Sequence, residues 1–132
     1  MASKIAAIST YRPKIALGKR VGTDDLVTFI ARSTGLNESG VRQVLLELRD
    51  ATLFYNLQGT PVYLEGLGTY TPKVGLDGTL GVGHRADNRL KNGLNTPGKF
   101  SGTIQNRENI GKSSDDLAAL WNEAHPDDLI AG

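Results

Sequence analysis

The segment 57–70 constrains the fold of this chain more than any other part of it. Its sequence is Leu-Gln-Gly-Thr-Pro-Val-Tyr-Leu-Glu-Gly-Leu-Gly-Thr-Tyr. A helical pattern ends where the segment begins, and Gly59 interrupts the chain before a short alternating stretch at 60–65. Gly66 and Gly68 then permit the positive φ angles that a tight connection requires. This order predicts a helix end, a strand, a Gly-x-Gly turn and a second strand directly after it.

Two amphipathic helices are predicted before this segment, the first over 24–33. Thr23 is a suitable N-cap for it, because a threonine hydroxyl can accept a hydrogen bond from an otherwise unpaired amide. Gly35 supplies the left-handed residue that ends it, and Asn37 caps the second helix. The side chains predicted to face inward are Leu26, Val27, Phe29 and Ile30 in the first helix, and Val41, Val44, Leu45, Leu48, Thr52 and Tyr55 in the second.

The second helix is apolar on more than one side. Leu46, Leu53 and Leu57 lie outside its main stripe. A helix of this kind needs apolar partners on more than one side. A symmetric dimer would supply the second partner. Burial in a monomeric core is the alternative, and it suits so small a unit less well.

A compact hairpin is predicted after the Gly-x-Gly turn. The strand 69–75 leads into Asp77-Gly78, a strong signal for a short hairpin turn, and the chain returns through a strand at 79–82. The return strand should pair with the strand before the turn, which predicts an antiparallel sheet.

A short basic helix is predicted at 85–95, with Asp87 or Asn88 as its N-cap. With it, the order of helix, helix, Gly-x-Gly hairpin, strand and short basic helix over 22–95 resembles the HU and integration host factor family. These are small bacterial proteins that bind and bend DNA as intertwined dimers. The family's last helix alternates basic and apolar residues, and the matching positions here are Arg85, Arg89, Leu90, Lys91, Leu94 and Asn95.

The resemblance implies an α+β fold in which two chains interlock. Two N-terminal helices would form the base of a homodimer, with Leu45, Leu48 and Tyr55 at its interface. An antiparallel sheet with a short hairpin and a short third helix would complete the domain. The expected parts of the chain are a basic N-terminal extension at 1–21 with a strand candidate at 11–17, an HU-like domain at 22–95, and a loop, helix and acidic tail at 96–132.

The sequence departs from this family at the DNA-wrapping arm. Family members carry long, Arg- and Lys-rich β-arms tipped by proline, which enter the minor groove and wedge between bases. Only a compact hairpin lies between Pro72 and Gly83, and Lys73 is its single basic residue. We therefore interpret Pro72 as a strand-edge residue and not as a wedge. What remains of the family's mechanism is binding directed by shape and phosphates through the body of the dimer.

The two ends of the chain carry opposite charges, although the formal net charge is only +1. The bases of residues 1–22, which include no acid, are Lys4, Arg12, Lys14, Lys19 and Arg20. The acids of residues 113–132, which include no Lys or Arg, are Asp115, Asp116, Glu123, Asp127 and Asp128. This pattern indicates electrostatic pairing, either between subunits or with nucleic acid at the basic end. Two solvated termini are the alternative.

The C-terminal extension is predicted to hold one helix. Residues 96–112 have a loop composition with room for one short strand, and Phe100 and Ile104 are its apolar anchors. Ser113 or Ser114 caps the helix that follows. Its apolar stripe consists of Leu117, Leu120, Trp121 and Ala124, and Pro126 stops it. Trp121 is a candidate interface anchor; packing on its own domain is the more common role of such a residue.

No catalytic constellation is recognisable. His84 and His125 are the only histidines, and neither has metal-type spacing with another ligand. The stretch Gly81-Val82-Gly83 lacks the third glycine and the helix of a dinucleotide loop. Without Cys, no disulfide or thiolate metal site can form, and no apolar run approaches the roughly 20 residues of a membrane span. We therefore expect a protein that is not an enzyme, uses no cofactor, metal, membrane or small-molecule substrate, and resides in the cytoplasm at the nucleoid.

The expected function is sequence-independent, architectural DNA binding by a homodimer that contacts the phosphate backbone of double-stranded DNA. The alternative is an HU-like structural subunit that self-assembles into filaments or larger assemblies through its basic N-terminal and acidic C-terminal extensions. The candidate nucleic-acid-binding residues are Lys14, Lys19, Arg20, Lys73, Arg85, Arg89 and Lys91, and the candidate interface residues are Leu45, Leu48, Tyr55 and Trp121.

Overall fold

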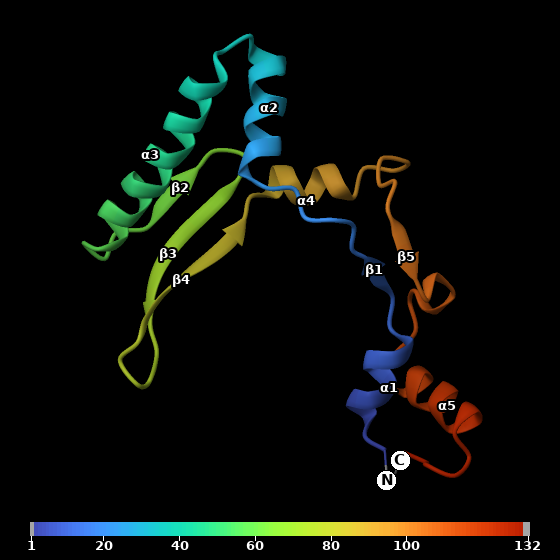
Figure 1. Ribbon diagram of the computed structural model, residues 1–132. Coiled ribbons are helices and arrows are strands. Elements are labelled where there is room, and N and C mark those ends of the chain that lie inside the picture. The colour runs from blue at the N-terminus through green and yellow to red at the C-terminus, as the bar shows by residue number, and fades with distance from the viewer. Residues whose placement is uncertain (1, 131–132) are drawn as a thin grey trace. The chain divides into compact units, whose positions relative to one another are not determined.

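The computed structural model describes residues 2–130 and has a mixed α+β fold, with helices and two antiparallel sheets (Figure 1). The chain forms two compact units. The central unit is the continuous stretch Lys19–Phe100. The terminal unit joins the described residues up to Gly18 with those from Ser101 onward. Each unit has its own sheet and its own buried apolar cluster.

The central unit contains three helices and a three-stranded sheet with the strand order β2-β3-β4. Its elements in chain order are α2 (Thr23–Thr34), α3 (Glu38–Asn56), β2 (Val62–Leu64), β3 (Gly68–Val74), β4 (Leu80–Ala86) and α4 (Asn88–Leu94). Both strand pairs are antiparallel. The predicted order of helices, strands and hairpin over this part of the chain is therefore confirmed.

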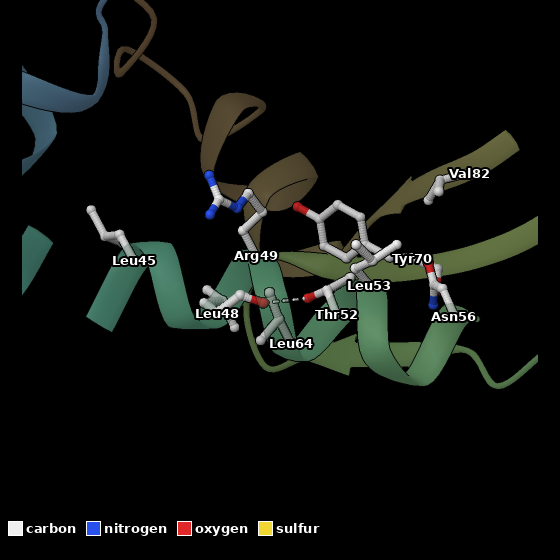
Figure 2. A pocket seen from close by; sticks show the side chains of 9 residues that line it. All are labelled: Leu45, Leu48, Arg49, Thr52, Leu53, Asn56, Leu64, Tyr70 and Val82. Atoms are coloured by element: carbon white, nitrogen blue, oxygen red, sulfur yellow. Dashed lines mark hydrogen bonds between the residues drawn. The ribbon is translucent and has the colours of Figure 1, made fainter. Parts of the chain in front are cut away.

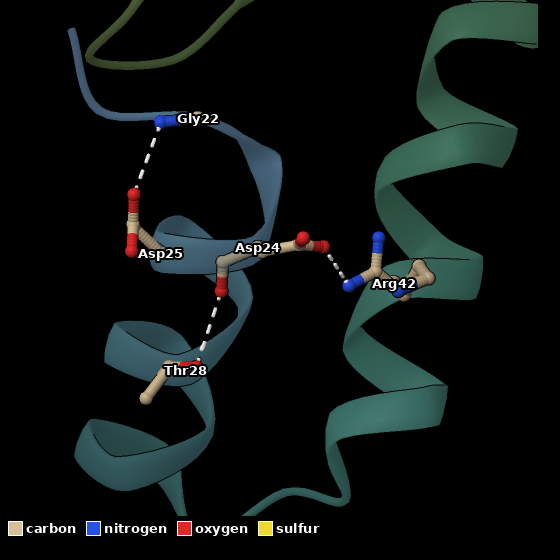
Figure 3. A network of polar contacts seen from close by, with 5 residues as sticks. All are labelled: Gly22, Asp24, Asp25, Thr28 and Arg42. Atoms are coloured by element: carbon tan, nitrogen blue, oxygen red, sulfur yellow. Dashed lines mark hydrogen bonds and ion pairs between the residues drawn. The ribbon is translucent and has the colours of Figure 1, made fainter.

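The helix ends follow the predicted caps with one exception. Gly35 ends α2 with a φ of 75°, and the Asn37 side chain accepts an amide hydrogen bond of 2.8 Å at the start of α3. The prediction that Thr23 caps α2 is wrong, because the N-cap is Gly22 and Thr23 already lies in the helix. Gly22 has no side chain to offer, and its amide donates to the Asp25 carboxylate at 3.3 Å instead (Figure 3). An acidic side chain in the first turn thus accepts a hydrogen bond from one of the otherwise unpaired amides at this helix start.

Helices α2 and α3 pack against each other along a small apolar cluster. Val27, Ala31 and Val41 are buried in it. On the surface of the same helix pair, the Arg42 guanidinium of α3 forms an ion pair with the Asp24 carboxylate of α2 (Figure 3). The ion pair is exposed, so the buried cluster contributes more to holding the two helices together.

Part of the predicted inward face of these helices is exposed in the single chain. On α2, Leu26 is 48% exposed and Phe29 is 69% exposed, so the single chain does not bury these two residues that were predicted to face inward. The side of α2 that is buried instead carries Val27 and Ala31. On α3, Val44 and Tyr55 are exposed in the same way. The apolar surface of both helices therefore exceeds what the central unit can cover.

The β3–β4 hairpin forms most of the central sheet. Its register runs without a bulge over the full length of both strands. The return strand is longer than the predicted 79–82 and includes Arg85, which the sequence had placed in the third helix. That helix begins only after Asp87, whose side chain accepts a hydrogen bond of 2.8 Å from the Arg89 amide. The predicted cap at Asp87 is confirmed, and the predicted helix start at Arg85 is wrong.

Pro72 lies in β3, opposite Val82 of β4. The short strand β2 pairs only with β3 residues 68–70, so β3 has no strand on its other side at Pro72. A proline, which has no amide hydrogen to donate, is compatible with such an open side. The residue therefore occupies a local edge, as predicted.

The terminal unit is built from both ends of the chain. Its elements are α1 (Lys4–Tyr11), β1 (Lys14–Ala16), β5 (Thr103–Gln105), a 3-10 turn (Arg107–Asn109) and α5 (Ser114–Ala124). Strands β1 and β5 pair antiparallel with Ile15 opposite Ile104, as the strand candidates at 11–17 and within 96–112 allowed. Helix α1 was not predicted. Phe100, one of the two predicted anchors, is exposed, whereas Ile104 is half-buried.

Side chains of the C-terminal segment hold the N-terminal helix in this unit. Ala7 of α1 is buried together with Ala118 and Ile130. The buried Asn109 side chain donates to the Tyr11 carbonyl at 2.7 Å. Other contacts between the two ends include the ion pair of Lys4 with Asp115 and the hydrogen bonds of Asn106 to the carbonyls of Thr10 and Arg12. Basic and acidic ends thus meet within one chain.

Helix α5 begins at the predicted cap, Ser113, and ends before Pro126. Trp121 packs against the buried cluster of the terminal unit, and its indole N–H donates to the Asp128 carbonyl at 2.7 Å. Its ring also stacks on His125 at a centroid distance of 3.9 Å. The indole therefore packs on its own unit, and its role as an interface anchor stays a prediction.

Candidate nucleic-acid interface

The central sheet has one polar and one apolar face, because side chains alternate along each strand. The polar face, defined by the register of β2, β3 and β4, carries Tyr63, Thr69, Thr71, Lys73, Gly81, Gly83 and Arg85. The apolar face carries Val62, Leu64, Tyr70, Pro72, Val74, Leu80, Val82 and His84. The two candidate cations of the sheet thus share one face.

Lys73 and Arg85 lie at two ends of a strip without bulky side chains. Arg85 is opposite Thr69, and Lys73 is opposite Gly81, so the two cations are about 13 Å apart along the strands. The Lys73 side chain extends along this strip, since a Cβ built on Gly81 would lie 3.5 Å from its Cε. Gly81 and Gly83 add no side chains between the cations, and the aliphatic part of Lys73 lies over them. Within the described residues, neither cation forms an ion pair.

Helix α4 adds the other two cations predicted for this region. The Arg89 Nη2 lies 3.1 Å from Glu65 Oε1, and both side chains are more than two-thirds exposed. Such an exposed pair contributes little stability, so a phosphate can compete with Glu65 for the guanidinium. Lys91 is also exposed, and within the part of the chain that the structure describes it has no ion-pair partner.

The Asp87 carboxylate connects α4 to the sheet. It accepts hydrogen bonds from the Arg89 amide at 2.8 Å and from the Tyr63 hydroxyl of β2 at 2.9 Å. These bonds favour the charged form, so the pKa of Asp87 lies below its ordinary value, with the Arg89 amide as the largest cause. The same contact raises the pKa of Tyr63. The Asp87 carboxylate thus links the start of α4 to Tyr63 of the sheet.

Acidification is expected to destabilise this connection. Because the pKa of Asp87 is lowered by folding, its stabilising effect is complete above the unfolded-state pKa and is lost as the pH falls through the lower, folded-state value. Asp87→Asn keeps a capping oxygen but does not titrate. The variant should therefore show a smaller decrease in melting temperature between pH 7 and pH 2.5 than the original chain does, measured by circular dichroism. An equal decrease in both proteins would contradict this role of Asp87.

The three N-terminal candidate cations are divided between the units. Lys14 lies on β1 of the terminal unit, where its ammonium donates to the Ser9 carbonyl at 2.7 Å. Lys19 and Arg20 belong to the central unit, precede α2 and are exposed. The structure thus places Lys73 and Arg85 on one face of the sheet and the cations of α4 in the same unit, and it does not bring Lys14 into that unit.

Two open hollows lie between α3 and the apolar face. The first, of about 430 Å³, is lined by Leu45, Leu48, Arg49, Thr52, Leu53, Asn56, Leu64, Tyr70 and Val82 (Figure 2). The second, of about 500 Å³, is lined by Leu53, Asn56, Leu57, Gly59, Pro72, Lys73, Val74, Leu80, Gly81 and Val82. Two of the predicted interface residues, Leu45 and Leu48, therefore border unfilled apolar space. Tyr55 is exposed on the same helix.

Asn56 is the one buried polar side chain that lines both hollows. Its amide nitrogen donates to the Thr60 carbonyl at 2.9 Å and to the Tyr70 carbonyl at 3.3 Å. Its Oδ1 is buried without a hydrogen-bond partner among the described residues. An unpaired buried oxygen is costly, so a donor from outside the single chain would be favourable here.

Sequence reasoning identified the cations of the polar face but not its neutral members. Thr69, Thr71 and Tyr63 share the face with Lys73, and two glycines of β4 flatten it. The signal for them is the period of two along each strand. It becomes usable only once the full length of β4 and its register are known.

No family model and no curated protein sequence matches this chain. No helix among the described residues is long and apolar enough to cross a membrane. The described part of the chain also has no group of three or more His, Cys, Asp or Glu side chains placed to hold a metal ion.

Proposed function

We propose that this chain is an HU-like, architectural DNA-binding protein that acts as a homodimer at the bacterial nucleoid and contacts the phosphate backbone of duplex DNA without reading its sequence. The observation that carries the proposal is the polar face of the central sheet. It presents Lys73 and Arg85 at the two ends of a strip that contains Gly81 and Gly83, and among the described residues neither cation has an ion-pair partner. Phosphate contacts of this kind position a protein on DNA but do not discriminate bases.

The dimer part of the proposal is supported by the apolar surface of α2, α3 and the apolar face. Leu53, Leu57 and Phe29 are more than half exposed, and two apolar hollows adjoin α3. Exposed apolar side chains that border such hollows are typical of a protein interface. A second copy packed there would cover it and would place two polar faces on one particle.

Affinity for duplex DNA is expected to fall steeply with salt. Two chains with Lys73 and Arg85 give about four phosphate contacts, for which log K should change with log salt with a slope of about −3.6. Between 50 and 200 mM salt, this corresponds to a loss of about 100-fold in affinity. Fluorescence anisotropy with a labelled duplex of random sequence measures it. Absence of binding at 50 mM, or binding that does not respond to salt, would refute the proposal.

A second candidate function is that of a structural subunit that self-assembles through its two extensions. It is favoured by the packing of α1 against α5, in which Lys4 and Asp115 pair. If neighbouring chains exchanged α1, the same contacts would link copy to copy. Negative-stain imaging of DNA-free protein tests this candidate, because discrete dimers would count against assembly through the extensions.

A further inference from the structure

The two edges of the central sheet are unlike. At one edge, β2 has three residues and directly follows Pro61, which limits strand addition. At the other edge, β4 has seven residues and a register without bulges, and it contains neither Pro nor Lys. Native proteins usually protect exposed edges with short strands, bulges, prolines or charged side chains. Of these features, β4 has only the charged side chain of Arg85.

The ladder to β3 determines which backbone groups of β4 face outward. The Gly75 amide donates to the Thr79 carbonyl at the hairpin end, and the Asp87 amide donates to the Leu67 carbonyl at the other end. Residues 79 and 87 therefore bond to the β3 side of the hairpin. Because hydrogen-bonded pairs alternate along an antiparallel ladder, the amides and carbonyls of residues 81, 83 and 85 also point toward β3. The amides and carbonyls of Leu80, Val82 and His84 therefore point to the outer edge.

The sequence of β4 is self-complementary about Gly83. Antiparallel pairing of two copies, centred there, sets Val82 against His84 of the second copy and forms hydrogen bonds between their outward groups. The two Gly83 residues then face each other as a pair without backbone hydrogen bonds between them, which is where the Cα atoms of two antiparallel strands are closest. Each Arg85 lies opposite the other chain's Gly81, which offers no side chain to obstruct it.

The same pairing would cover apolar surface. Leu80 is 76% exposed and Val82 is 54% exposed, and both belong to the apolar face. A strand added at this edge lies directly beside them. On the opposite side of the joined sheet, the polar faces of both copies become one continuous surface that carries Lys73 and Arg85 from each chain.

We propose that β4 pairs antiparallel with β4 of a second copy, in the register that places the two Gly83 residues opposite each other. This contact goes beyond the proposed function, because it requires no DNA and differs from the contact through the apolar surface of α3. Chains that use both contacts join into assemblies larger than a dimer. The pairing also predicts a six-stranded sheet with one continuous cationic face.

A cysteine pair tests the register directly, because the chain contains no cysteine of its own. A Cβ at Gly83 would lie 3.8 Å from its nearest neighbour, the Thr71 carbonyl oxygen, so Gly83→Cys fits the fold. In the proposed register, the two introduced thiols face each other at a Cα separation of about 4.5 Å, within disulfide range. Gly81→Cys is the matched control. Its Cα would be about 13 Å along the strands from the same residue of the second copy.

The full chain with each substitution is oxidised at about 0.15 M salt, which screens repulsion between the cations of the two copies beyond about 8 Å, and is analysed on a non-reducing gel. We expect a covalent dimer of the Gly83→Cys chain and mainly monomer of the Gly81→Cys chain. Equal cross-linking at both positions, or none at Gly83→Cys, would overturn the proposal.

A second substitution tests whether backbone pairing is the cause. Val82→Pro removes an amide that points to the outer edge of β4. The ladder to β3 stays intact, because Val82 forms a pair with Pro72 that has no backbone hydrogen bonds. Added to the Gly83→Cys chain, it should reduce cross-linking to the level of the Gly81→Cys control. Val82→Thr, which keeps the amide, should not. Undiminished cross-linking with Val82→Pro in a folded chain would show that the edge of β4 is not the contact.

Discussion

Duplex DNA binding at 50 mM salt is expected to fall by about 100-fold or more when Lys73→Glu and Arg85→Glu are combined. The two side chains are exposed on the polar face, and among the described residues neither has an ion-pair partner. The double variant removes about four phosphate contacts from a dimer and adds four negative charges at the same places. The remaining affinity should also respond less to salt, since fewer counterions are released on binding.

The matched control is the double variant Arg32→Glu and Lys99→Glu. It changes the net charge by the same amount, but neither residue lies on the sheet. Its affinity for the duplex should remain within a few-fold of that of the original chain. If both double variants lose binding equally, overall charge and not the polar face governs binding. If the Lys73 and Arg85 variant binds like the original, the cations before α2 become the stronger candidates.

The local features of the central unit could be predicted from the sequence because their causes are local. Gly35 adopts the left-handed conformation expected of a helix end, and Asn37 and Asp87 cap the helices that follow them. The turn at Asp77-Gly78 forms as its residues indicate: Gly78 has a φ of 84°, and the Asp77 carboxylate accepts from the Thr79 amide at 3.0 Å. Each of these depends on a few neighbouring residues.

The length of β4 was underestimated because its sequence resembles a loop followed by a helix. Two glycines and the basic run from Arg85 onward concealed a strand that pairs over its whole length with β3. Pairing with a partner strand overrides weak local preference. The error affects the candidate site directly, because it moves Arg85 from a helix to the polar face of the sheet.

The terminal unit could not be foreseen for a different reason. Its contacts join residues almost a hundred positions apart, such as Asn109 with Tyr11 and Asn106 with Arg12. No periodicity within either extension indicates which segment far along the chain will be its partner. The opposite charges of the two ends indicated pairing between subunits or with nucleic acid, whereas Lys4 and Asp115 form an ion pair within one chain. The charge pattern could not specify that α1 and β1 would pack with α5 and β5.

Gly68→Ala is expected to cause the largest loss of stability of any single alanine substitution in the central sheet. Gly68 is buried at the start of β3 with a φ of 150°, a region that residues with a side chain rarely occupy. A Cβ there would lie 2.3 Å from the Arg85 carbonyl oxygen and 2.7 Å from His84 Nε2. The His84 ring can move, but the Arg85 carbonyl belongs to the backbone of β4. Relief of the overlap would therefore require the two strands to separate.

Backbone strain and steric overlap together should cost about 3–5 kcal/mol, a large part of the stability of an ordinary domain. Urea unfolding followed by circular dichroism measures the difference. Gly83→Ala is the matched control on the same pair of strands, because its Cβ would have only ordinary contacts at 3.8 Å or more; it should change stability by less than about 1 kcal/mol. Similar losses in the two variants would mean that glycine is needed in this sheet for flexibility. A selective loss in Gly68→Ala would show that the close approach of β3 and β4 at Gly68 leaves no room for a side chain.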